Sequence, residues 1–299
     1  MEQDPREFAN EYQKAINRRL AATTKQLMRY PIMLYSFDGK LYQPKGSGVF
    51  FHYKQFSFIL TAAHVIDDYQ PLFTNLGSGI VPVREFRNLR GISNLKENKT
   101  VDIGWITLTV NFSRELATFR AFLTIEDLID HDPNDYRLEI PLYVFAGFPA
   151  AMNMKVGSRD AKIRFDVGAI HVGPVKNRDA VFKHLHLEAT ANIAFGLLGK
   201  APEIMRNIPK FKLPELNGMS GSPIWWLFYN AKENEPEFSS KVIGIFSDYR
   251  NGKYHCAIGT KIFIVVENID VWIEKGYFDL SHEDQHRFWS ENIDNKLKS

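Results

Sequence analysis

The chain has very little cysteine, no marked excess of either charge and no long apolar run. Its 299 residues contain one cysteine, Cys256, so no disulfide can form within the chain, whereas secreted proteases are usually held by several. The formal net charge is +2. Without a dense lysine or arginine patch we expect no nucleic-acid partner. No apolar run approaches the roughly 20 residues that span a bilayer, so we expect no membrane association.

The N-terminal segment lacks the features of a secretory signal. Residues 1–7 are acidic and polar, the opposite of the basic start and apolar stretch of a signal peptide. Together with the single cysteine, this composition predicts a cytoplasmic protein of prokaryotic type. A hydrophobic fraction of 44% is ordinary for a globular protein with a substantial core.

Apolar periodicity predicts a helix over about residues 5–30. Phe8, Tyr12, Ile16 and Leu20 recur every four residues, which places them on one stripe. Pro31 ends the pattern. Such stripes mostly pack against the core of their own chain, which favours a packing helix over a partner-binding one.

Two β-rich blocks follow the helix. The first covers residues 32–108 and the second begins near residue 140, with a polar connector at 126–137. Short runs rich in aromatic and β-branched residues, with turns between them, predict a sandwich or barrel. The expected strands of the second block include 163–167 and 184–187, and a closing helix is expected at 269–275.

Three short strings carry the chemistry. They supply a histidine, an aspartate and a serine, and they read Thr61-Ala62-Ala63-His64, Val101-Asp102-Ile103-Gly104 and Gly218-Met219-Ser220-Gly221-Ser222-Pro223. A serine hydroxyl is a weak nucleophile, which needs an imidazole to take its proton and an acid to orient that imidazole. Each string alone has a plain structural reading: a core histidine, a turn-capping aspartate and a Gly/Ser-rich turn. Together they predict acyl transfer by a serine nucleophile.

The order His, Asp, Ser is the chymotrypsin-type order. The three strings resemble the motifs of the trypsin/chymotrypsin superfamily of serine peptidases. Two further strings, Val242–Ser247 and Ala257–Ile262, are similar to its cleft-lining strand and to the strand before its C-terminal helix. The resemblance covers about residues 32–275. The missing disulfides and Met219, which stands where secreted members carry an aspartate, indicate the intracellular or bacterial-type branch.

The resemblance implies a mostly β fold of two six-stranded antiparallel β-barrels with an N-terminal and a C-terminal helix. The expected division is an N-terminal helical extension (1–31), a peptidase domain (32–275) and a polar tail (276–299). Within the domain the first barrel covers about 32–125, the second about 140–268, and an insertion about 194–216. That insertion either gates the cleft or is a plain surface loop.

The resemblance also assigns roles. His64 would act as general base and then general acid, Asp102 would orient it, and Ser220 would be the nucleophile. The backbone N–H groups of Gly218 and Ser220 would form the oxyanion hole. Ser247 would donate a hydrogen bond to Asp102.

Two departures from the family pattern affect activation and specificity. The Met219 side chain carries no charge and cannot form a salt bridge with a new N-terminus released by cleavage. We therefore expect that this protein is not activated by N-terminal cleavage. Tyr249 stands where many members have a glycine that opens the specificity pocket, so we expect a narrow pocket for small apolar side chains.

The sequence thus predicts a serine endopeptidase that cleaves protein or peptide substrates, in a role compatible with host defence or stress response. The insertion, the N-terminal helix or a regulatory protein partner would control it. The alternative is a catalytically silent or partner-gated binding module with a protease fold. A viral polyprotein protease is less compatible with the N-terminal helix.

We expect no cofactor and no metal. Residues 196–200 have the wrong spacing for a phosphate loop. His184, His186 and Glu188 would share one face of a predicted strand, a pattern that strands produce without binding zinc. Cys256 is expected to be a small core residue.

Overall fold

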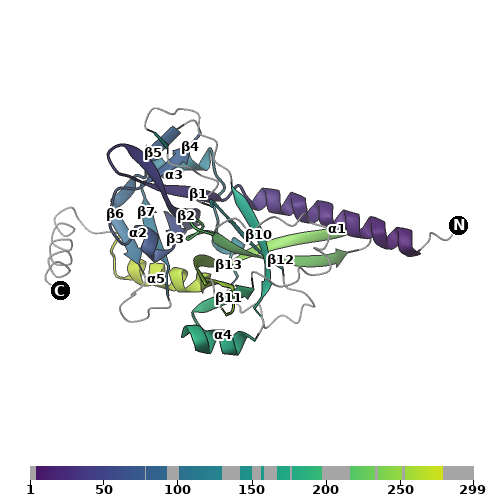
Figure 1. Cartoon of the computed structure of the whole chain (residues 1–299). Coiled ribbons are helices and arrows are strands. Elements are labelled where there is room, and N and C mark those ends of the chain that lie inside the picture. Colours follow the sequence, from purple (N-terminus) through teal and green to yellow (C-terminus); the bar gives the residue numbers. More distant parts are fainter. Residues whose placement is uncertain are drawn as a thin grey trace.

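Two antiparallel β units make up the body of the protein, with a long helix at the N-terminal end and a second helix after the last strand (Figure 1). The computed structural model describes residues 5–77, 79–92, 101–129, 142–149, 156–157, 167–175, 177–196, 216–232, 235–250 and 253–278. The predicted mostly β architecture with its two terminal helices is confirmed.

The first unit is an eight-stranded sheet with the order β5-β4-β1-β2-β3-β7-β6, and β9 pairs with β2. Its strands are β1 (Pro31–Phe37), β2 (Leu41–Tyr53), β3 (Phe56–Thr61), β4 (Phe73–Leu76), β5 (Gly79–Pro82), β6 (Glu85–Ile92), β7 (Gly104–Leu108) and β9 (Val156–Gly157). The expected six strands were therefore too few. The additional strands are two to four residues long, too short for a hydrophobic alternation to reveal them.

The second unit is a closed six-stranded barrel with the order β10-β11-β14-β13-β12-β8. Its strands are β8 (Leu142–Gly147), β10 (Gly168–Pro174), β11 (Asn192–Gly196), β12 (Pro223–Lys232), β13 (Glu235–Arg250) and β14 (Cys256–Lys261). Closure pairs each strand on both sides and leaves no edge open. The number of strands in this barrel is the six that the resemblance implied.

One apolar core joins the two units. It contains Val49 and Leu60 from the first unit, together with Val144, Trp225 and Ile245 from the second, and each of these side chains is at most 1% exposed. Because the units share buried side chains, residues at their junction are held rigidly. The strings that carry the chemistry lie at this junction.

The N-terminal helix α1 (Pro5–Leu27) packs beside β13, and Figure 1 shows it extending along the β12–β13 hairpin. Ile16, Leu20 and Leu27 are buried, which confirms the prediction of a packing helix; the side chain of Phe8 lies outside the described residues. Thr24 hydrogen-bonds His171 of β10 across 3.1 Å. Burial lowers the pKa of His171 to about 4, so this contact is made by a neutral imidazole.

The predicted strand at 184–187 is wrong. His184 and Leu185 are the last residues of helix α4 (Arg178–Leu185), and His186 follows the helix in the left-handed conformation at φ 54°. Val181 and Phe182 are buried against Ile258 of the barrel, so packing of a helical face decides the structure here. His184 and His186 consequently do not share a strand face.

The remaining helices are short or begin earlier than expected. They are α2 (Ala63–Ile66), α3 (Val110–Ala117), the 3₁₀ turn η1 (Ile125–Asp127) and α5 (Ile262–Glu274). The closing helix was expected only from residue 269. The predicted strand at 163–167, most of the insertion at 194–216, the connector beyond 129 and the polar tail beyond 278 lie outside the described residues. Among the described helices, none has the length and apolar character to cross a bilayer.

Candidate active site

His64 is the second residue of the four-residue helix α2 (Ala63–Ile66), which follows the end of β3 after Ala62. Ala62 is extended and α2 begins at Ala63. Ala63, Val65 and Ile66 are buried, whereas 46% of the His64 side chain is exposed. The small alanines allow the strand to end against the core, and the buried neighbours fix the direction in which the imidazole points.

Asp102 holds His64 through both carboxylate oxygens. Its Oδ2 lies 2.6 Å from His64 Nδ1, and its Oδ1 accepts the His64 backbone N–H at 3.1 Å. An ionised carboxylate only accepts hydrogen bonds, so Nδ1 carries the proton and Nε2 presents a lone pair. The pair therefore has the tautomer that a general base requires.

The aspartate string requires a glycine at position 104 for steric reasons. A Cβ at this position would lie 3.1 Å from the Gly91 carbonyl and 2.8 Å from Ile66 Cδ1. Only glycine lets β7 begin this close to α2. The buried side chains of Val101 and Ile103 flank Asp102, which leaves the carboxylate turned toward His64.

The electrostatic surroundings favour the imidazolium form of His64. The pKa of His64 is raised chiefly by its hydrogen bond to Asp102, with smaller contributions from the charges of Asp102, Asp67 and Asp248, while burial opposes the shift. A raised pKa stabilises the protonated histidine that forms when serine gives up its proton.

Sequence reasoning missed Thr260, and its expectation for Ser247 is wrong. The Asp102 backbone N–H donates to Thr260 Oγ1 of β14 at 3.1 Å. The Ser247 hydroxyl donates instead to the Ile258 carbonyl at 3.1 Å. A hydroxyl has one proton, so it cannot also donate to Asp102. The available signal was a threonine inside the string Ala257–Ile262, which offers a buried polar group on an apolar strand.

The nucleophile string folds as two consecutive tight turns. The Met219 N–H donates to the Leu216 carbonyl at 3.0 Å, and the Ser222 N–H donates to the Met219 carbonyl at 2.9 Å. Gly218 and Gly221 occupy the third position of these turns with φ values of 86° and 92°. This is the position at which a type II turn requires a positive φ, hence glycine. The Gly-x-Ser-Gly spacing is thus explained by backbone geometry.

The same turns leave two N–H groups available for an anion. Only the fourth residue of a β-turn donates into the turn, so Gly218 and Ser220 do not. Neither N–H group has a hydrogen-bond acceptor among the described residues. These are the two donors that the sequence predicted for an oxyanion hole.

Ser47 of β2 fastens the nucleophile loop to the first unit. Its N–H donates to the Ser220 carbonyl at 2.7 Å, and its hydroxyl donates to the Gly218 carbonyl at 2.9 Å. The same hydroxyl accepts the Phe148 N–H at 3.0 Å, and the side chain is fully buried. Thr61, three residues before His64, donates to the Ser47 carbonyl at 2.6 Å. Ser47 therefore connects the histidine string to the serine loop, and no motif indicated it.

The hydroxyl of Ser220 donates to the Ser247 carbonyl at 3.2 Å. Ser247 is the additional residue of a β-bulge, because Phe246 pairs with Gly259 and Asp248 with Ile258. Bulges redirect a strand near functional sites, and here the bulge turns a carbonyl toward the nucleophile loop. A serine acting as the predicted nucleophile would have to exchange this acceptor for His64 Nε2.

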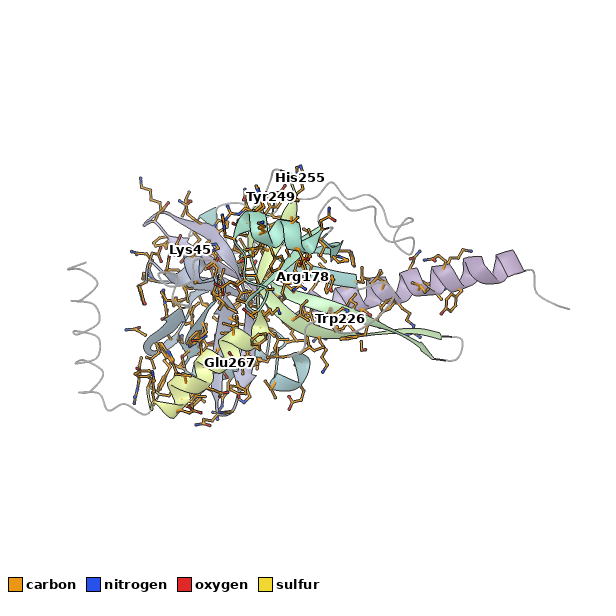
Figure 2. The ribbon with its side chains drawn as sticks, turned by 90° about the horizontal axis from the view of Figure 1, so that it is seen from below. Lys45, Arg178, Trp226, Tyr249, His255 and Glu267 are labelled. Atoms are coloured by element: carbon orange, nitrogen blue, oxygen red, sulfur yellow. The ribbon has the colours of Figure 1, made fainter. Side chains whose placement is uncertain are left out.

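Tyr249 follows the bulge and is half-buried against the apolar cluster that also contains Met219. Figure 2 shows it on the opposite side of the molecule from α5, which carries Glu267. The predicted narrowing of a specificity pocket by this ring remains a prediction, since residues 197–215 lie outside the described part of the chain.

Two other expectations concern the cysteine and a metal. Cys256 is buried, as expected, and burial raises the pKa of its thiol, so it is protonated and packs as a small apolar residue. Within the described ranges, no three histidine, cysteine, aspartate or glutamate side chains are grouped closely enough to hold a metal ion.

Two antiparallel β units, with His64 and Asp102 on one and Ser220 on the other, define the chymotrypsin-like protease fold. No family model and no curated protein matches the sequence. Among the solved structures that are similar over most of the chain are two proteins of the protease fold. They are kallikrein-related peptidase 10 in complex with Zn²⁺ (15% identity, TM-score 0.46, covering 83% of this chain and 97% of that chain) and the scabies mite inactivated protease paralogue S-D1 (12%, 0.46, 84% and 94%).

Proposed function

We propose that this protein is a serine endopeptidase that cleaves protein or peptide substrates through an acyl-enzyme. The observation that carries the proposal is the 2.6 Å pairing of His64 Nδ1 with Asp102 Oδ2 beside a serine loop with two available N–H groups. This is the constellation that activates a serine hydroxyl and stabilises an oxyanion.

The reaction proceeds in two halves. Ser220 Oγ attacks the substrate carbonyl while His64 Nε2 takes its proton, and Asp102 stabilises the imidazolium. The N–H groups of Gly218 and Ser220 bind the oxyanion, and His64 returns the proton to the leaving amine. Water then attacks the acyl group with His64 again as base, which releases the acid and restores the Ser220 hydroxyl.

One observation favours a second candidate, a silent or partner-gated module. The Ser220 hydroxyl is bonded to the Ser247 carbonyl rather than to His64. In the active arrangement that we propose, the same hydroxyl donates to His64 Nε2 instead, and rotamer changes of side chains are fast compared with catalysis. We therefore favour the endopeptidase.

Labelling with a fluorophosphonate probe tests the proposal. The wild-type protein is expected to be labelled and Ser220→Ala not, because phosphonylation requires the activated hydroxyl. His64→Ala is expected to lose at least a thousandfold in labelling rate. A folded wild-type protein that stays unlabelled would contradict the endopeptidase and favour the silent module.

Tyr249 leads to a proposal about the residue before the cleaved bond. A bulky ring beside the nucleophile leaves room for small apolar side chains. Profiling with a peptide library checks this, and Tyr249→Gly should broaden acceptance toward larger side chains. A strong preference of the wild type for lysine or arginine at that position would overturn it.

A further inference from the structure

Ser47 lies where three segments of the chain meet. Its strand β2 belongs to the first unit, Phe148 follows β8 of the second unit, and Gly218 belongs to the nucleophile loop. The Ser47 hydroxyl donates to the Gly218 carbonyl at 2.9 Å and accepts the Phe148 N–H at 3.0 Å. These contacts join residues that are 171 and 101 positions apart in the sequence. One buried hydroxyl therefore connects both units and the loop.

The close approach of these segments to Ser47 requires glycine. A Cβ at position 221 would lie 1.9 Å from the Ser47 carbonyl oxygen and 2.2 Å from Thr61 Oγ1. A Cβ at Gly147, the last residue of β8, would lie 3.1 Å from Ser47 Oγ. Nonbonded atoms pack best at about 3.5–4.0 Å. The loop and β8 can thus reach Ser47 because Gly221 and Gly147 have no side chain.

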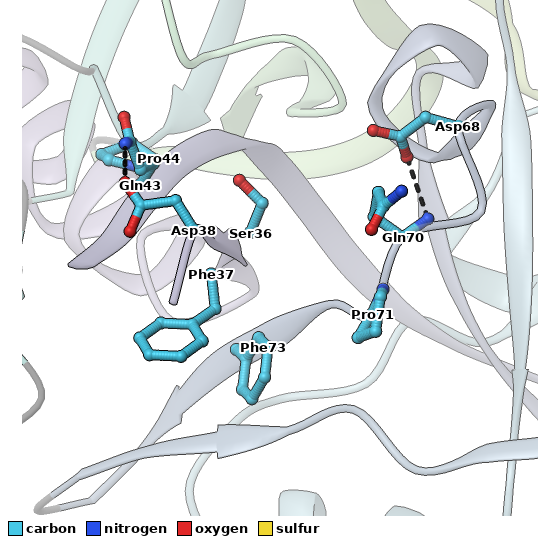
Figure 3. Close-up of a pocket in the computed structure, with 9 residues that line it drawn as sticks. All are labelled: Ser36, Phe37, Asp38, Gln43, Pro44, Asp68, Gln70, Pro71 and Phe73. Carbon is cyan, nitrogen blue, oxygen red and sulfur yellow. Dashed lines mark hydrogen bonds between the residues drawn. The ribbon is translucent and has the colours of Figure 1, made fainter. Parts of the chain in front are cut away.

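Strand β2 presents Ser47 from a fixed position. In the hollow beside the β1–β2 hairpin, Figure 3 shows the Asp38 carboxylate bonded to the Gln43 side chain. Two residues further along, Lys45 Nζ pairs with Asp68 Oδ1 at 2.5 Å, which ties β2 to the segment after α2. A hydroxyl carried by such a strand has less freedom than one carried by a loop.

The two N–H groups of the expected oxyanion hole are not equally well held. The peptide unit that carries the Ser220 N–H also carries the Met219 carbonyl, which accepts the Ser222 N–H at 2.9 Å. The peptide unit that carries the Gly218 N–H also carries the Asn217 carbonyl. Among the described residues, no backbone N–H donates to that carbonyl. The direction of the Gly218 N–H therefore depends on how the following peptide unit is fixed.

That following unit is the one that Ser47 holds. It carries the Gly218 carbonyl, which accepts the Ser47 hydroxyl, and the Met219 N–H, which donates to the Leu216 carbonyl at 3.0 Å. Both of its polar groups are thus fixed. The two dihedral angles of Gly218 lie between this unit and the N–H, and glycine has the widest choice of both. Without the hydroxyl, one bond remains and this freedom reaches the N–H.

We infer that Ser47 is a positioning residue for the oxyanion hole, whose hydroxyl sets the direction of the Gly218 N–H from the first unit. The inference rests on the proposed function, in which this N–H binds the oxyanion. Ser47→Ala removes the hydroxyl but keeps the backbone groups that contact Ser220 and Thr61. The substitution should therefore weaken oxyanion binding and leave the general base His64 in place.

Acylation by p-nitrophenyl acetate and by its thiono analogue tests this inference. In both reactions Ser220 Oγ bonds to the acyl carbon, His64 takes the serine proton, and p-nitrophenolate leaves with the electron pair of the ester bond. Negative charge develops on oxygen in one reaction and on sulfur in the other. Sulfur accepts hydrogen bonds weakly, so the N–H groups stabilise mainly the oxygen anion. The ratio of the two rates is independent of the folded fraction and of the base.

The wild-type ratio of the oxygen to the sulfur ester is expected to exceed the ratio for hydroxide ion. Ser47→Ala should lower the oxygen-ester rate about tenfold and leave the sulfur-ester rate within about twofold, since complete loss of one donor costs roughly 100- to 1,000-fold. Ser47→Cys keeps a weak donor and should give an intermediate ratio, which also serves if thermal melting shows that Ser47→Ala does not fold.

Thr107→Val is the matched control. It removes another buried hydroxyl, on β7, that has no hydrogen-bond partner within the described part of the chain, and it should leave the ratio unchanged.

The outcomes that contradict the two proposals differ. Absence of Ser220-dependent p-nitrophenol release would overturn the proposed function and the role of Ser47 with it. Release with a wild-type ratio equal to that of hydroxide would overturn the positioning role alone. Equal losses with both esters in the Ser47 variants would do the same, because Ser47 would then support only the fold.

Discussion

Three carboxylates surround His64 and determine its proton affinity. Asp102 is bonded to the imidazole, and Asp67 and Asp248 act on it through their charge alone. Each favours the protonated histidine, so the pKa of His64 lies above the ordinary value of about 6.5. The His64–Asp102 ion pair therefore stabilises the folded protein. This contribution is fully present below the ordinary histidine pKa of about 6.5 and is lost as the pH rises through the raised pKa of His64.

The pH dependence of labelling follows from this raised pKa. A general base must be neutral, so the fluorophosphonate labelling rate should rise with pH and reach half its maximum above pH 6.5. Asp67→Asn and Asp248→Asn should each move the midpoint to lower pH and change the plateau rate little, whereas Glu267→Gln should leave the midpoint in place. A wild-type midpoint below 6.5 would contradict the assignment of His64 as the base.

Thr260 offers a matched pair of substitutions. Thr260→Val keeps the side-chain shape but removes the acceptor of the Asp102 N–H, and a lost partner of this kind costs about 1–3 kcal/mol of stability. Because Asp102 orients His64, the labelling rate should also fall about tenfold. Thr260→Ser keeps the hydroxyl and should retain the rate. Urea unfolding and labelling kinetics measure both effects; equal rates in the two variants would refute a positioning role.

At the level of elements, a buried ion pair shapes the segment that follows His64. Arg90 of β6 pairs with Glu85 at 2.5 Å, and their side chains are 4% and 9% exposed. The same guanidinium donates to the carbonyls of Ile66 and Gln70, at 3.4 and 2.9 Å. Arg90 thereby closes the C-terminal end of α2 and holds the loop that carries Asp68.

Replacing one or both residues of the Arg90–Glu85 pair separates the effect of the pair on protein stability from its effect on the position of the segment after His64. Arg90→Met alone should lower the unfolding free energy by about 3–5 kcal/mol, because Glu85 remains buried without a counter-ion. The double variant Arg90→Met/Glu85→Leu should recover much of that loss, but its labelling rate should remain low, since neither residue then holds Ile66 and Gln70. If labelling recovered together with stability, the pair would have no positioning role.

The nucleophile loop is held by apolar packing on one side and by Ser47 on the other. Met219 is fully buried in a cluster with Phe145, Leu216 and Trp226. The position that would need an acid for N-terminal activation is thus part of the core. Packing of this kind supports the prediction that the loop needs no new N-terminus to take its shape.

At the scale of the whole molecule, α1 provides the test of that prediction. Removal of residues 1–30 exposes the surface that Ile16, Leu20 and Leu27 bury, so the unfolding free energy should fall by on the order of 5 kcal/mol. Labelling of the truncated protein should not exceed that of the full chain. Leu20→Ala is the control for destabilisation alone. Faster labelling after truncation would show that a cleavage switch exists.

Some features followed from local sequence because their causes are local. The positive φ values at Gly218 and Gly221, the small residues before His64 and the close approach at Gly104 each need one residue type at one position. The strings could therefore be recognised without the fold. The mostly β architecture followed from runs of aromatic and β-branched residues. The host-defence or stress role and the cytoplasmic location stay predictions.

Other features depended on contacts between distant segments. Residues 184–187 alternate like a strand, yet Val181 and Phe182 give more burial as part of a helix, and the β-branched start of α5 was likewise overridden by packing. Thr260 and Ser47 each hydrogen-bond a residue more than 150 positions away. A sequence pattern records spacing along one segment, whereas a buried polar group is satisfied by whichever partner the fold brings to it. The sequence by itself therefore determined which groups could react, and the tertiary structure decided which residues hold them in place and that Ser220 rests on Ser247.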